Sequence, residues 1–297
     1  MNKMEEIISV LQGLQQSLKD INFEEFEVCY RGLGEINWTD TPLLFRHHNL
    51  NKEAEMVTEF SRNFPSETQL THTIDILTEL QHYGAHTRLL DATTNPLVAL
   101  FFACGGWEQI YNSQRYKELN NSDGAIRIFK VPKSEVKTID SETVSLLANL
   151  ARLDSDKRTF RDLEWQCERD QMGVWHTGQI TTTRLELLQK NVKDVNRVLL
   201  VKTNLNTPRI RAQHGVFFIF GGLDGVEGME YTNDIDTILN RHIKKTTIPF
   251  TMSYHHADVV IPNYCKEKIL KDLDKYINMS FSTLCPDRQD YIKTLVK

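Results

Sequence analysis

The residues with the clearest chemical potential lie between positions 80 and 104, directly in front of a strongly marked helix start. Asn95 is a favourable N-cap, and Pro96 suits the first helical position. The apolar run 97–102 then predicts a buried helix. Because the first turn of a helix exposes unpaired N–H groups and the positive end of the helix dipole, this start is suited to hold an anion or a nucleotide phosphate.

The segment Thr87–Thr94 is expected to be a loop that reaches this helix start. It carries four side chains that could contact an anion or a nucleotide: Arg88, Asp91, Thr93 and Thr94. A simpler alternative stays open, in which Asp91 and the two threonines only cap the helix while Arg88 pairs with Asp91.

A second group of candidate binding residues is Tyr30-Arg31-Gly32, at the end of a short strand predicted over residues 26–31. Glycine lets the backbone bend sharply and lets a ligand approach closely. An arginine beside it is well suited to bind a phosphate with two parallel hydrogen bonds. The alternative is a surface arginine next to a turn.

Two further segments place polar side chains near these groups. His82 and Tyr83 end a helix that is predicted over residues 74–83, and they face the stretch after it. Residues 209–220 resemble a pair of strands bent at Gly215. If the first half is extended, three side chains fall on one face: Arg209, Arg211 and Gln213.

The remaining patterns predict the elements that must position these residues. Helical spacing of apolar residues predicts helices over 3–20, 52–63, 141–153, 266–277 and 287–296. Short apolar or alternating runs predict strands over 125–131, 195–202, 246–250 and 259–261. We therefore expect an α+β fold, with mixed or antiparallel sheets flanked by helices. Residues 1–22 would form an N-terminal helix, and residues 23–297 one domain with a helical insertion at about 141–192 and a helical C-terminus.

Composition limits the class of protein. The 297 residues are 40% hydrophobic and 25% charged, as in an ordinary soluble domain, and the net charge of −5 argues against a wholly basic nucleic-acid binder. The five cysteines form no C-x-x-C pair, so neither a metal site nor a disulfide framework is predicted. With no membrane-spanning run and no export signal, reduced thiols in the cytoplasm are the natural expectation.

Five motifs in this order resemble the FRG-domain family, which is named for an aromatic-Arg-Gly tripeptide near the N-terminus. The similarity spans roughly residues 25–290. The matching pieces are Tyr30-Arg31-Gly32, Gln81-His-Tyr-Gly84, Thr87-Arg-Leu-Leu-Asp91, Thr94-Asn-Pro-Leu-Val-Ala-Leu-Phe-Phe-Ala103 and Arg209-Ile-Arg-Ala-Gln-His-Gly-Val-Phe217. The segment from Ile261 to Asp287 also resembles the ending of the family.

A second resemblance is to the Arg-Ser-Glu class of ADP-ribosyltransferases, and it implies a split-sheet core and NAD as the substrate. In that class an aromatic-Arg-Gly strand end holds the NAD phosphates, as Tyr30-Arg31-Gly32 would here. A Ser-Thr-Ser strand leads into a helix, which Ala92-Thr93-Thr94-Asn95-Pro96 resembles. The third part, a Gln-x-Glu strand, would fall at Gln213-His214-Gly215, where glycine replaces the catalytic glutamate.

The resemblance implies a role for each matched residue. Arg31, with Tyr30 and Gly32 on either side of it in the tripeptide, would neutralise the pyrophosphate. Thr94, with Thr93 beside it in the sequence, would order Arg31 or the ribose. The helix start at Asn95 would add the stabilisation of the helix dipole. Gln213 would hydrogen-bond a ribose hydroxyl. The pocket would be lined by His82, Tyr83 or Arg88, and the missing carboxylate would have to come from Asp91 or Glu227.

Four functions remain open on this basis. The leading hypothesis is an NAD-using ADP-ribosyltransferase inside a microbial cell, in a toxin or phage-defence context, with an unknown protein or nucleic acid as acceptor. An NAD glycohydrolase is the closest variant. A non-catalytic module could instead bind a nucleotide or nucleic acid through four arginines: Arg31, Arg88, Arg209 and Arg211. A hydrolase that uses His82 and Asp91 as an acid/base pair is the last option.

Overall fold

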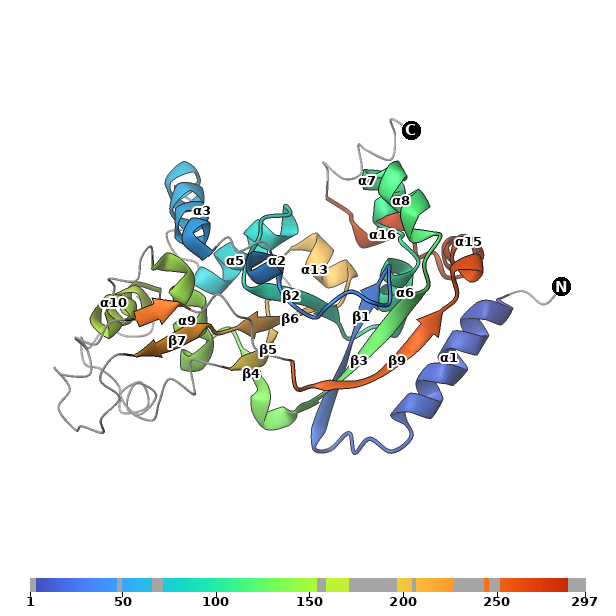
Figure 1. Cartoon of the computed structure of the whole chain (residues 1–297), viewed down its shortest axis with the longest axis horizontal. Helices are drawn as coiled ribbons and strands as arrows, with labels where there is room; N and C mark the ends of the chain where they lie inside the picture. The colour runs from blue at the N-terminus through green and yellow to red at the C-terminus, as the bar shows by residue number, and fades with distance from the viewer. Residues whose placement is uncertain are drawn as a thin grey trace.

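The computed structural model describes residues 4–46, 50–65, 72–153, 159–170, 197–204, 207–226, 243–245 and 252–287. A seven-stranded sheet runs through the middle of the molecule in the order β4-β5-β6-β2-β1-β3-β9 (Figure 1). Its neighbouring strands are antiparallel except for the parallel pair β4 and β5. The strands are β1 Phe26–Leu33, β2 Leu89–Thr93, β3 Gly124–Pro132, β4 Val136–Thr138, β5 Val198–Lys202, β6 Gly215–Phe220 and β9 His255–Ile261, with β7 Leu223–Val226 and β8 Ile243–Lys245 in a separate two-stranded sheet.

The large sheet divides between β1 and β2. Strand β1 pairs with β3 along its whole length, and β2 pairs with β6 over all five of its residues. Between β1 and β2, whose residues are all described, the register joins only Tyr30 to Thr93. The sheet therefore consists of a four-stranded half and a three-stranded half that meet at one residue pair.

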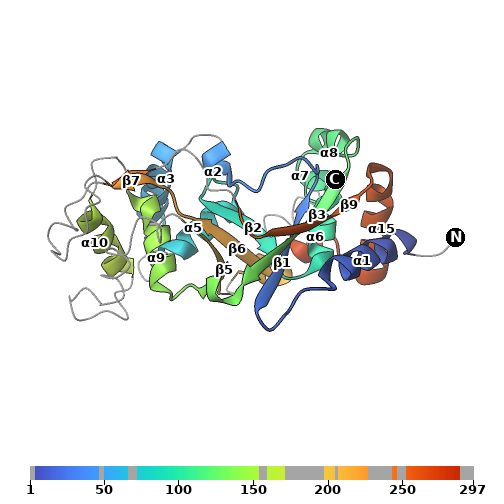
Figure 2. The ribbon, with the colours of Figure 1, turned by 60° about the horizontal axis from the view of Figure 1, so that its bottom comes forward.

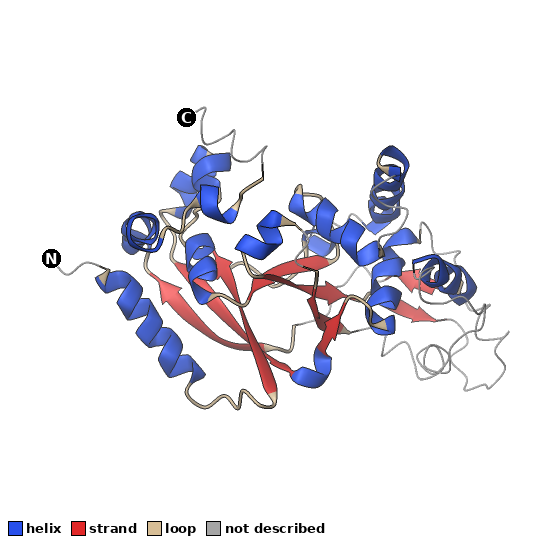
Figure 3. Ribbon diagram, turned by 180° about the vertical axis from the view of Figure 1, so that it is seen from behind, coloured by secondary structure: helices blue, strands red, loops and turns tan. Residues whose placement is uncertain are grey.

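Helices cover both halves of the sheet. In Figures 1 and 2, α1 and α15 lie at one end of the molecule, and α3, α9 and α10 lie at the other. Figure 3 shows the same strands from behind, with helices around them. The helices are α1 Glu5–Leu18, α2 Leu43–Arg46, α3 Leu50–Asn63, α5 Thr73–His82, α6 Pro96–Ala103, α7 Glu108–Tyr111, α8 Ser113–Leu119, α9 Glu142–Asn149, α10 Phe160–Asp170, α13 Pro208–Ala212, α15 Lys266–Ile277 and α16 Phe281–Leu284, and the 3₁₀ turns are Lys133–Glu135, Leu150–Arg152 and Asn263–Cys265.

Three apolar clusters hold these layers together. One lies between α5, α9 and the four-stranded half, and it includes Leu89 of β2. A second lies on the opposite face of that half, where Leu90 of β2 contributes. The third joins α1, α6, α15 and α16 to the three-stranded half. Since successive residues of β2 enter different clusters, this strand is buried on both faces.

The expected α+β class, with sheets flanked by helices, is confirmed. The N-terminal helix packs on the body, because Ile7, Val10 and Leu14 of α1 are buried in the same cluster as α15. Within the expected insertion 141–192, α9 and α10 are helical, and residues 154–158 and 171–192 lie outside the described part. The strand expected over 246–250 also lies outside it, as do residues 288–296 of the last expected helix.

Three local predictions are wrong. Thr87–Thr94 is not a loop, since β2 occupies Leu89–Thr93 in the middle of the sheet. Strand β1 does not stop before Gly32 but continues to Leu33. Residues 209–212 are not extended, because Thr207 caps a short helix through its side chain and the proline after it fits the first helical position.

Candidate functional site

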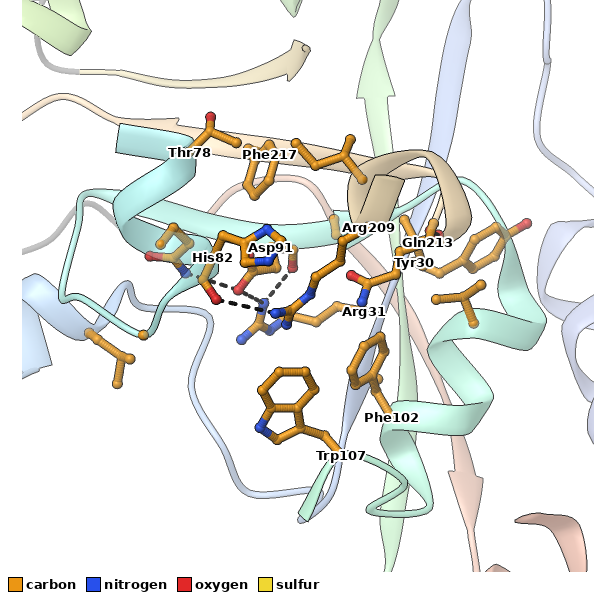
Figure 4. Close-up of a pocket in the computed structure, with 18 of the residues that line it drawn as sticks. Tyr30, Arg31, Thr78, His82, Asp91, Phe102, Trp107, Arg209, Gln213 and Phe217 are labelled. Atoms are coloured by element: carbon orange, nitrogen blue, oxygen red, sulfur yellow. Dashed lines mark hydrogen bonds and ion pairs between the residues drawn. The ribbon is translucent and has the colours of Figure 1, made fainter. Parts of the chain in front are cut away.

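A cavity of about 620 Å³ lies beside the junction of the two sheet halves (Figure 4). Side chains from β1, β2, α5 and α13, which are far apart in the sequence, border it together. The structure brings eight predicted site residues to this cavity: Tyr30, Arg31, Gly32, His82, Tyr83, Asp91, Thr93 and Gln213. A volume of this size is within the range of small-molecule and cofactor sites.

Arg31 is the cation that β1 presents at the cavity. Its Nη1 donates a hydrogen bond to the backbone oxygen of Asp91 and lies 4.0 Å from the Oδ2 of that residue. Its side chain is 17% exposed, and its buried Nε has no hydrogen-bond partner among the described residues. Burial lowers the pKa of Arg31; Asp91 and Asp40 oppose this, and Arg127 adds to it. The guanidinium therefore keeps donor capacity for an anion.

Arg127 on β3 lies opposite Arg31 in the register, but its guanidinium is paired with two carboxylates. Its Nε and Nη2 bind both carboxylate oxygens of Asp258 at 3.0 and 3.1 Å. Its Nη1 donates to Asp40 Oδ2 at 2.9 Å. Two carboxylates thus neutralise Arg127, whereas Arg31 next to it has no such bidentate partner within the described part of the chain.

Asp91 is held from the α5 side of the cavity. Its Oδ2 accepts a hydrogen bond from Gln81 Nε2 at 3.0 Å, and Thr87 Oγ1 donates to Gln81 Oε1 at 2.6 Å. The Asp91 side chain is 58% exposed. The prediction that Asp91 pairs with Arg88 is wrong, because Arg31 and Gln81 are its neighbours.

Thr93 links three elements at the floor of the cavity. Its hydroxyl donates to the backbone oxygen of Gln213 at 2.6 Å and accepts from the backbone N–H of Asn95 at 3.0 Å. The Asn95 side chain accepts from Leu97 N at 2.9 Å, which confirms its predicted role as the N-cap of α6. Thr94 and Asn95 do not line the cavity. Thr94 is exposed, and its N–H binds the oxygen of His214.

Gln213 reaches the cavity from the end of α13. Its Nε2 donates to the backbone oxygen of Leu284 at 3.0 Å and lies 3.6 Å from the sulfur of Cys285. The side-chain amide thus connects the cavity wall to α16. Its carbonyl oxygen is the part left to contact a ligand.

Arg88 does not line the cavity, so the expectation that it contacts a ligand there is wrong. Its side chain is fully buried on the other side of β2. Its Nε and Nη2 bind the two carboxylate oxygens of Glu53 at 2.7 and 2.5 Å, and its Nη1 donates to the oxygen of Phe220 at 3.2 Å. Glu53 already supplies the pairing that an anionic ligand would have offered.

Tyr30 and Gly32 border the cavity, and packing within the fold accounts for both residue types. Tyr30 follows the alternation of the strand, so its ring is buried in the α1, α6 and α15 cluster, and burial raises its pKa. A Cβ on Gly32 would lie 2.0 Å from the oxygen of Ala99 and 2.7 Å from the nitrogen of Ala103. Glycine is therefore required for the close contact of β1 with α6.

His82 pairs with a different carboxylate from the one expected. Its Nε2 lies 2.9 Å from Asp287 Oδ2, and only 7% of the His82 side chain is exposed. His82 and Asp91 line the same cavity, but the carboxylate that pairs with His82 is Asp287. The backbone oxygen of His82 accepts from Arg209 Nη1 at 3.2 Å, and the Arg209 guanidinium lies 4.2 Å from the centre of the Trp107 ring. Arg209 thus spans from α13 to two other walls (Figure 4).

The sequence reasoning missed the aromatic and acidic residues of the opposite wall. Trp107, Phe102 and Trp38 supply large apolar surfaces to the cavity, and Glu108 and Gln81 supply polar ones. Gln81 belongs to the Gln81-His-Tyr-Gly84 motif, whereas Trp107 and Glu108 directly follow Gly105-Gly106 and belong to none of the five motifs. A tryptophan and a glutamate directly after two glycines were the available signal.

Within the described residues, no three His, Cys, Asp or Glu side chains gather so as to hold a metal ion. In that same part of the chain, every helix is too short or too polar to cross a membrane. The groups available to a ligand at this cavity are arginine, carboxyl, amide and aromatic side chains.

The comparisons with known proteins address only the part of the chain that holds β1, β2 and α6. The family model of the FRG domain matches residues 26–110. No curated protein and no solved structure matches the chain. The resemblance beyond residue 110, and the resemblance to ADP-ribosyltransferases, stay predictions. The stretch that matches the FRG domain, residues 26–110, brings Arg31, Asp91 and Thr93 to the cavity.

Proposed function

We propose that the cavity binds NAD and that the protein is an NAD-using, ADP-ribosyltransferase-like enzyme. The observation that carries this proposal is the position of Arg31, whose side chain lines a cavity of about 620 Å³ and has no bidentate carboxylate partner among the described residues. The cavity lies where the sheet divides, so several strands and helices can contact one elongated ligand.

Arg31 would hold the pyrophosphate of NAD. A charge-assisted hydrogen bond in a partly buried site is stronger than a neutral one, and an arginine can bind a phosphate through two parallel bonds. Arg209 lines the same cavity and supplies a second guanidinium. Two cationic groups suit the two charges of a pyrophosphate.

The aromatic wall would hold the flat rings of the ligand. Trp107 and Phe102 line the cavity opposite the polar residues of β2 (Figure 4). Stacking on tryptophan suits both the nicotinamide and the adenine ring, which are planar. The same wall excludes water, which strengthens the contacts of Arg31.

The reaction would break the bond between nicotinamide and ribose. The bonding electron pair leaves with the nicotinamide ring, which becomes neutral, while the ribose carbon gains oxocarbenium character. A nucleophile of the acceptor then forms the new bond to that carbon and loses its proton. A carboxylate near the ribose would stabilise the positive charge, and Asp91 is an acidic side chain at the cavity. Glu227, the other expected source, lies outside the described residues.

Two related functions remain as alternatives. With water as the nucleophile, the same cavity would act as an NAD glycohydrolase. A non-catalytic nucleotide-binding module is favoured by one specific observation: Gly215 begins β6 at the position where the transferases carry a glutamate. The Gln213 side-chain amide is also engaged with Leu284, so it supports the fold as well as any ligand.

The test is to incubate the purified protein with NAD and to measure nicotinamide release, with and without cell lysate. We expect release by the wild type and its loss in Arg31→Ala. The matched control is Arg62→Ala, which removes an exposed arginine of α3 that is 76% exposed and pairs with Glu59. Dependence on lysate indicates a macromolecular acceptor, and release without lysate indicates a glycohydrolase. If folded wild-type protein binds NAD but releases no nicotinamide, the binding module replaces the enzyme.

The cellular setting is part of the same proposal. An enzyme that consumes NAD in the cytoplasm of a microbial cell would suit a toxin or a phage-defence system. Expression of the wild type should then lower cellular NAD and slow growth, and Arg31→Ala should do neither. Normal growth with unchanged NAD on expression, or under phage challenge, argues against this setting.

A further inference from the structure

Glu108 is a carboxyl at the cavity that the site described above leaves without a role. It is the first residue of α7 and follows Trp107 directly. It lines the same cavity as Arg31 and Arg209. Within the described part of the chain, its carboxylate makes no hydrogen bond or ion pair with another side chain. The backbone N–H of Glu108 itself donates to this carboxylate, and the remaining acceptor capacity is available to a ligand.

Asp91 is the natural comparison, because it is also an acidic side chain at this cavity. Its Oδ2 accepts from Gln81 and lies 4.0 Å from Arg31, and more than half of its side chain is exposed. Protein groups and water thus satisfy Asp91. The Glu108 side chain is more buried than that of Asp91, in a wall that includes Trp107. No side chain among the described residues donates a hydrogen bond to it.

The charged groups around Glu108 do not replace a ligand. Arg115 of α8 and Lys266 of α15 influence it from a distance. Arg115 pairs with Glu118 at 3.1 Å. The fully buried Lys266 donates two hydrogen bonds of 2.7 Å, to the backbone oxygens of Gly34 and Leu119. Burial therefore dominates and raises the pKa of Glu108, although a hydrogen bond from its own backbone N–H and these two cations oppose the rise.

We propose that the Glu108 carboxylate accepts hydrogen bonds from the hydroxyl groups of a sugar in the bound nucleotide. This inference rests on the proposed function, because it places the sugar of the same ligand. Hydroxyl groups are donors that match the free oxygens of a carboxylate. Arg31 and Arg209 would hold the phosphates, Trp107 would contact a ring, and Glu108 would fix the sugar that joins them.

A proton linkage follows from this arrangement. In the empty cavity, burial favours the protonated carboxyl. Hydroxyl donors favour the ionised form, so the bound state has the lower pKa at Glu108. The free protein then carries more protons than the complex. Binding must release protons, and the affinity must increase as the pH rises through the pKa of the free protein.

The experiment is calorimetric titration with ADP-ribose, at about pH 5.5 and about pH 7.5, in buffers of different ionisation enthalpy. The wild type should bind more tightly at the higher pH and release a fraction of a proton at the lower one. Glu108→Gln should lose about tenfold in affinity at the higher pH, as expected when one charge-assisted contact is removed, and little at the lower. Glu108→Asp, which keeps the charge, should keep the pH dependence.

Glu118→Gln is the matched control, because it removes a neighbouring glutamate of α8 whose side chain is 51% exposed. It should leave both the affinity and the proton release unchanged. If the wild type binds and Glu108→Gln keeps the same affinity and proton release, the inference fails while the proposed function stands. If Asp91→Asn abolishes the proton release instead, Asp91 is the linked group and the inference is overturned. If the folded wild type binds neither ADP-ribose nor NAD, both proposals fail.

Discussion

Arg31 lies on β1, and Arg88 directly precedes β2. The two arginines differ in the groups that pair with their guanidinium. Arg88 is fully buried with both oxygens of Glu53 on its guanidinium and the oxygen of Phe220 on its third nitrogen. Arg31 lies at a cavity, binds one backbone oxygen of Asp91 and keeps an unpaired Nε. Both had been expected to contact a ligand. Only the arginine without a bidentate carboxylate partner keeps the capacity to do so.

The difference shows what decides between a structural and a functional arginine. A bidentate carboxylate satisfies the geometry of a guanidinium as well as a phosphate does, so a partner within the chain excludes a ligand. Arg127 supports the same rule, since Asp258 and Asp40 occupy it although it lies opposite Arg31 in the sheet. The following variants test how far this comparison holds.

The largest effect is expected for Glu53→Gln on the Arg88 side. Removing one partner of a buried pair leaves an uncompensated charge, which costs about 3–5 kcal/mol. The free energy of unfolding from urea titration measures this loss. Glu59→Gln on the same helix is the control, because its side chain is 51% exposed and its pair with Arg62 lies at the surface. Equal effects of the two variants would contradict the structural role of Glu53.

The next effect is expected for Gly32→Ala, beside Arg31. The new Cβ would meet backbone atoms of α6, which cannot move like a flexible side chain. Overpacking of this kind costs about 1–3 kcal/mol and occasionally more. Gly34→Ala is the control, since its nearest contact is the end of the Leu119 side chain at 3.0 Å. If the two variants unfold at the same urea concentration, the close packing of β1 on α6 is not what selects Gly32.

Arg31→Ala should separate binding from stability. Loss of a charge-assisted contact to phosphate is expected to weaken the binding of ADP-ribose by about 1.5–3 kcal/mol, or roughly 10- to 100-fold. Its effect on unfolding should be clearly smaller than that of Glu53→Gln. Calorimetry and urea titration of the same preparations measure both quantities. A variant that unfolds easily but binds normally would place Arg31 in the same class as Arg88.

The smallest effect concerns Lys266, a buried cation that has carbonyl partners in place of a carboxylate. Burial lowers its pKa from the ordinary 10.5. Between its pKa in the folded protein and the ordinary value, the unfolded chain binds more protons, so stability should rise with pH in that window. Urea titrations from about pH 8 to about pH 10 should show this rise in the wild type and not in Lys266→Met. Parallel pH profiles would indicate that Lys266 stays charged when folded.

The sequence predicted the elements whose signals are local. The Asn95-Pro96 start of α6 and the bounds of α15 follow from capping and helical spacing. It failed at Thr87–Thr94, because a five-residue strand buried on both faces has no alternation to distinguish it from a loop. The extended conformation predicted for residues 209–212 is wrong because Thr207 is the N-cap of a short helix.

The candidate site was also predicted only in part, because its residue types are recognisable locally but their long-range partners are not. Arg31, Asp91, Thr93 and Gln213 belong to motifs, so their types could be recognised, and they line one cavity. Whether Arg88 faces that cavity depends on Glu53, which is 35 residues away in the sequence. The partner of His82 is likewise a distant residue, Asp287. Long-range pairing is not encoded in local spacing, so these assignments needed the fold.

The single register pair between β1 and β2 has a mechanical consequence. Backbone pairing joins the two halves only at Tyr30 and Thr93, so side chains supply the other contacts across the boundary, such as Phe129 against Phe218 and the Arg31 hydrogen bond to the Asp91 backbone oxygen. Rotation of one half against the other would leave the pairing within each half intact but would disrupt the apolar cluster that spans them. The large sheet is thus made of two separately paired halves, with Arg31 of β1 and Asp91 of β2 on opposite sides of the boundary between them.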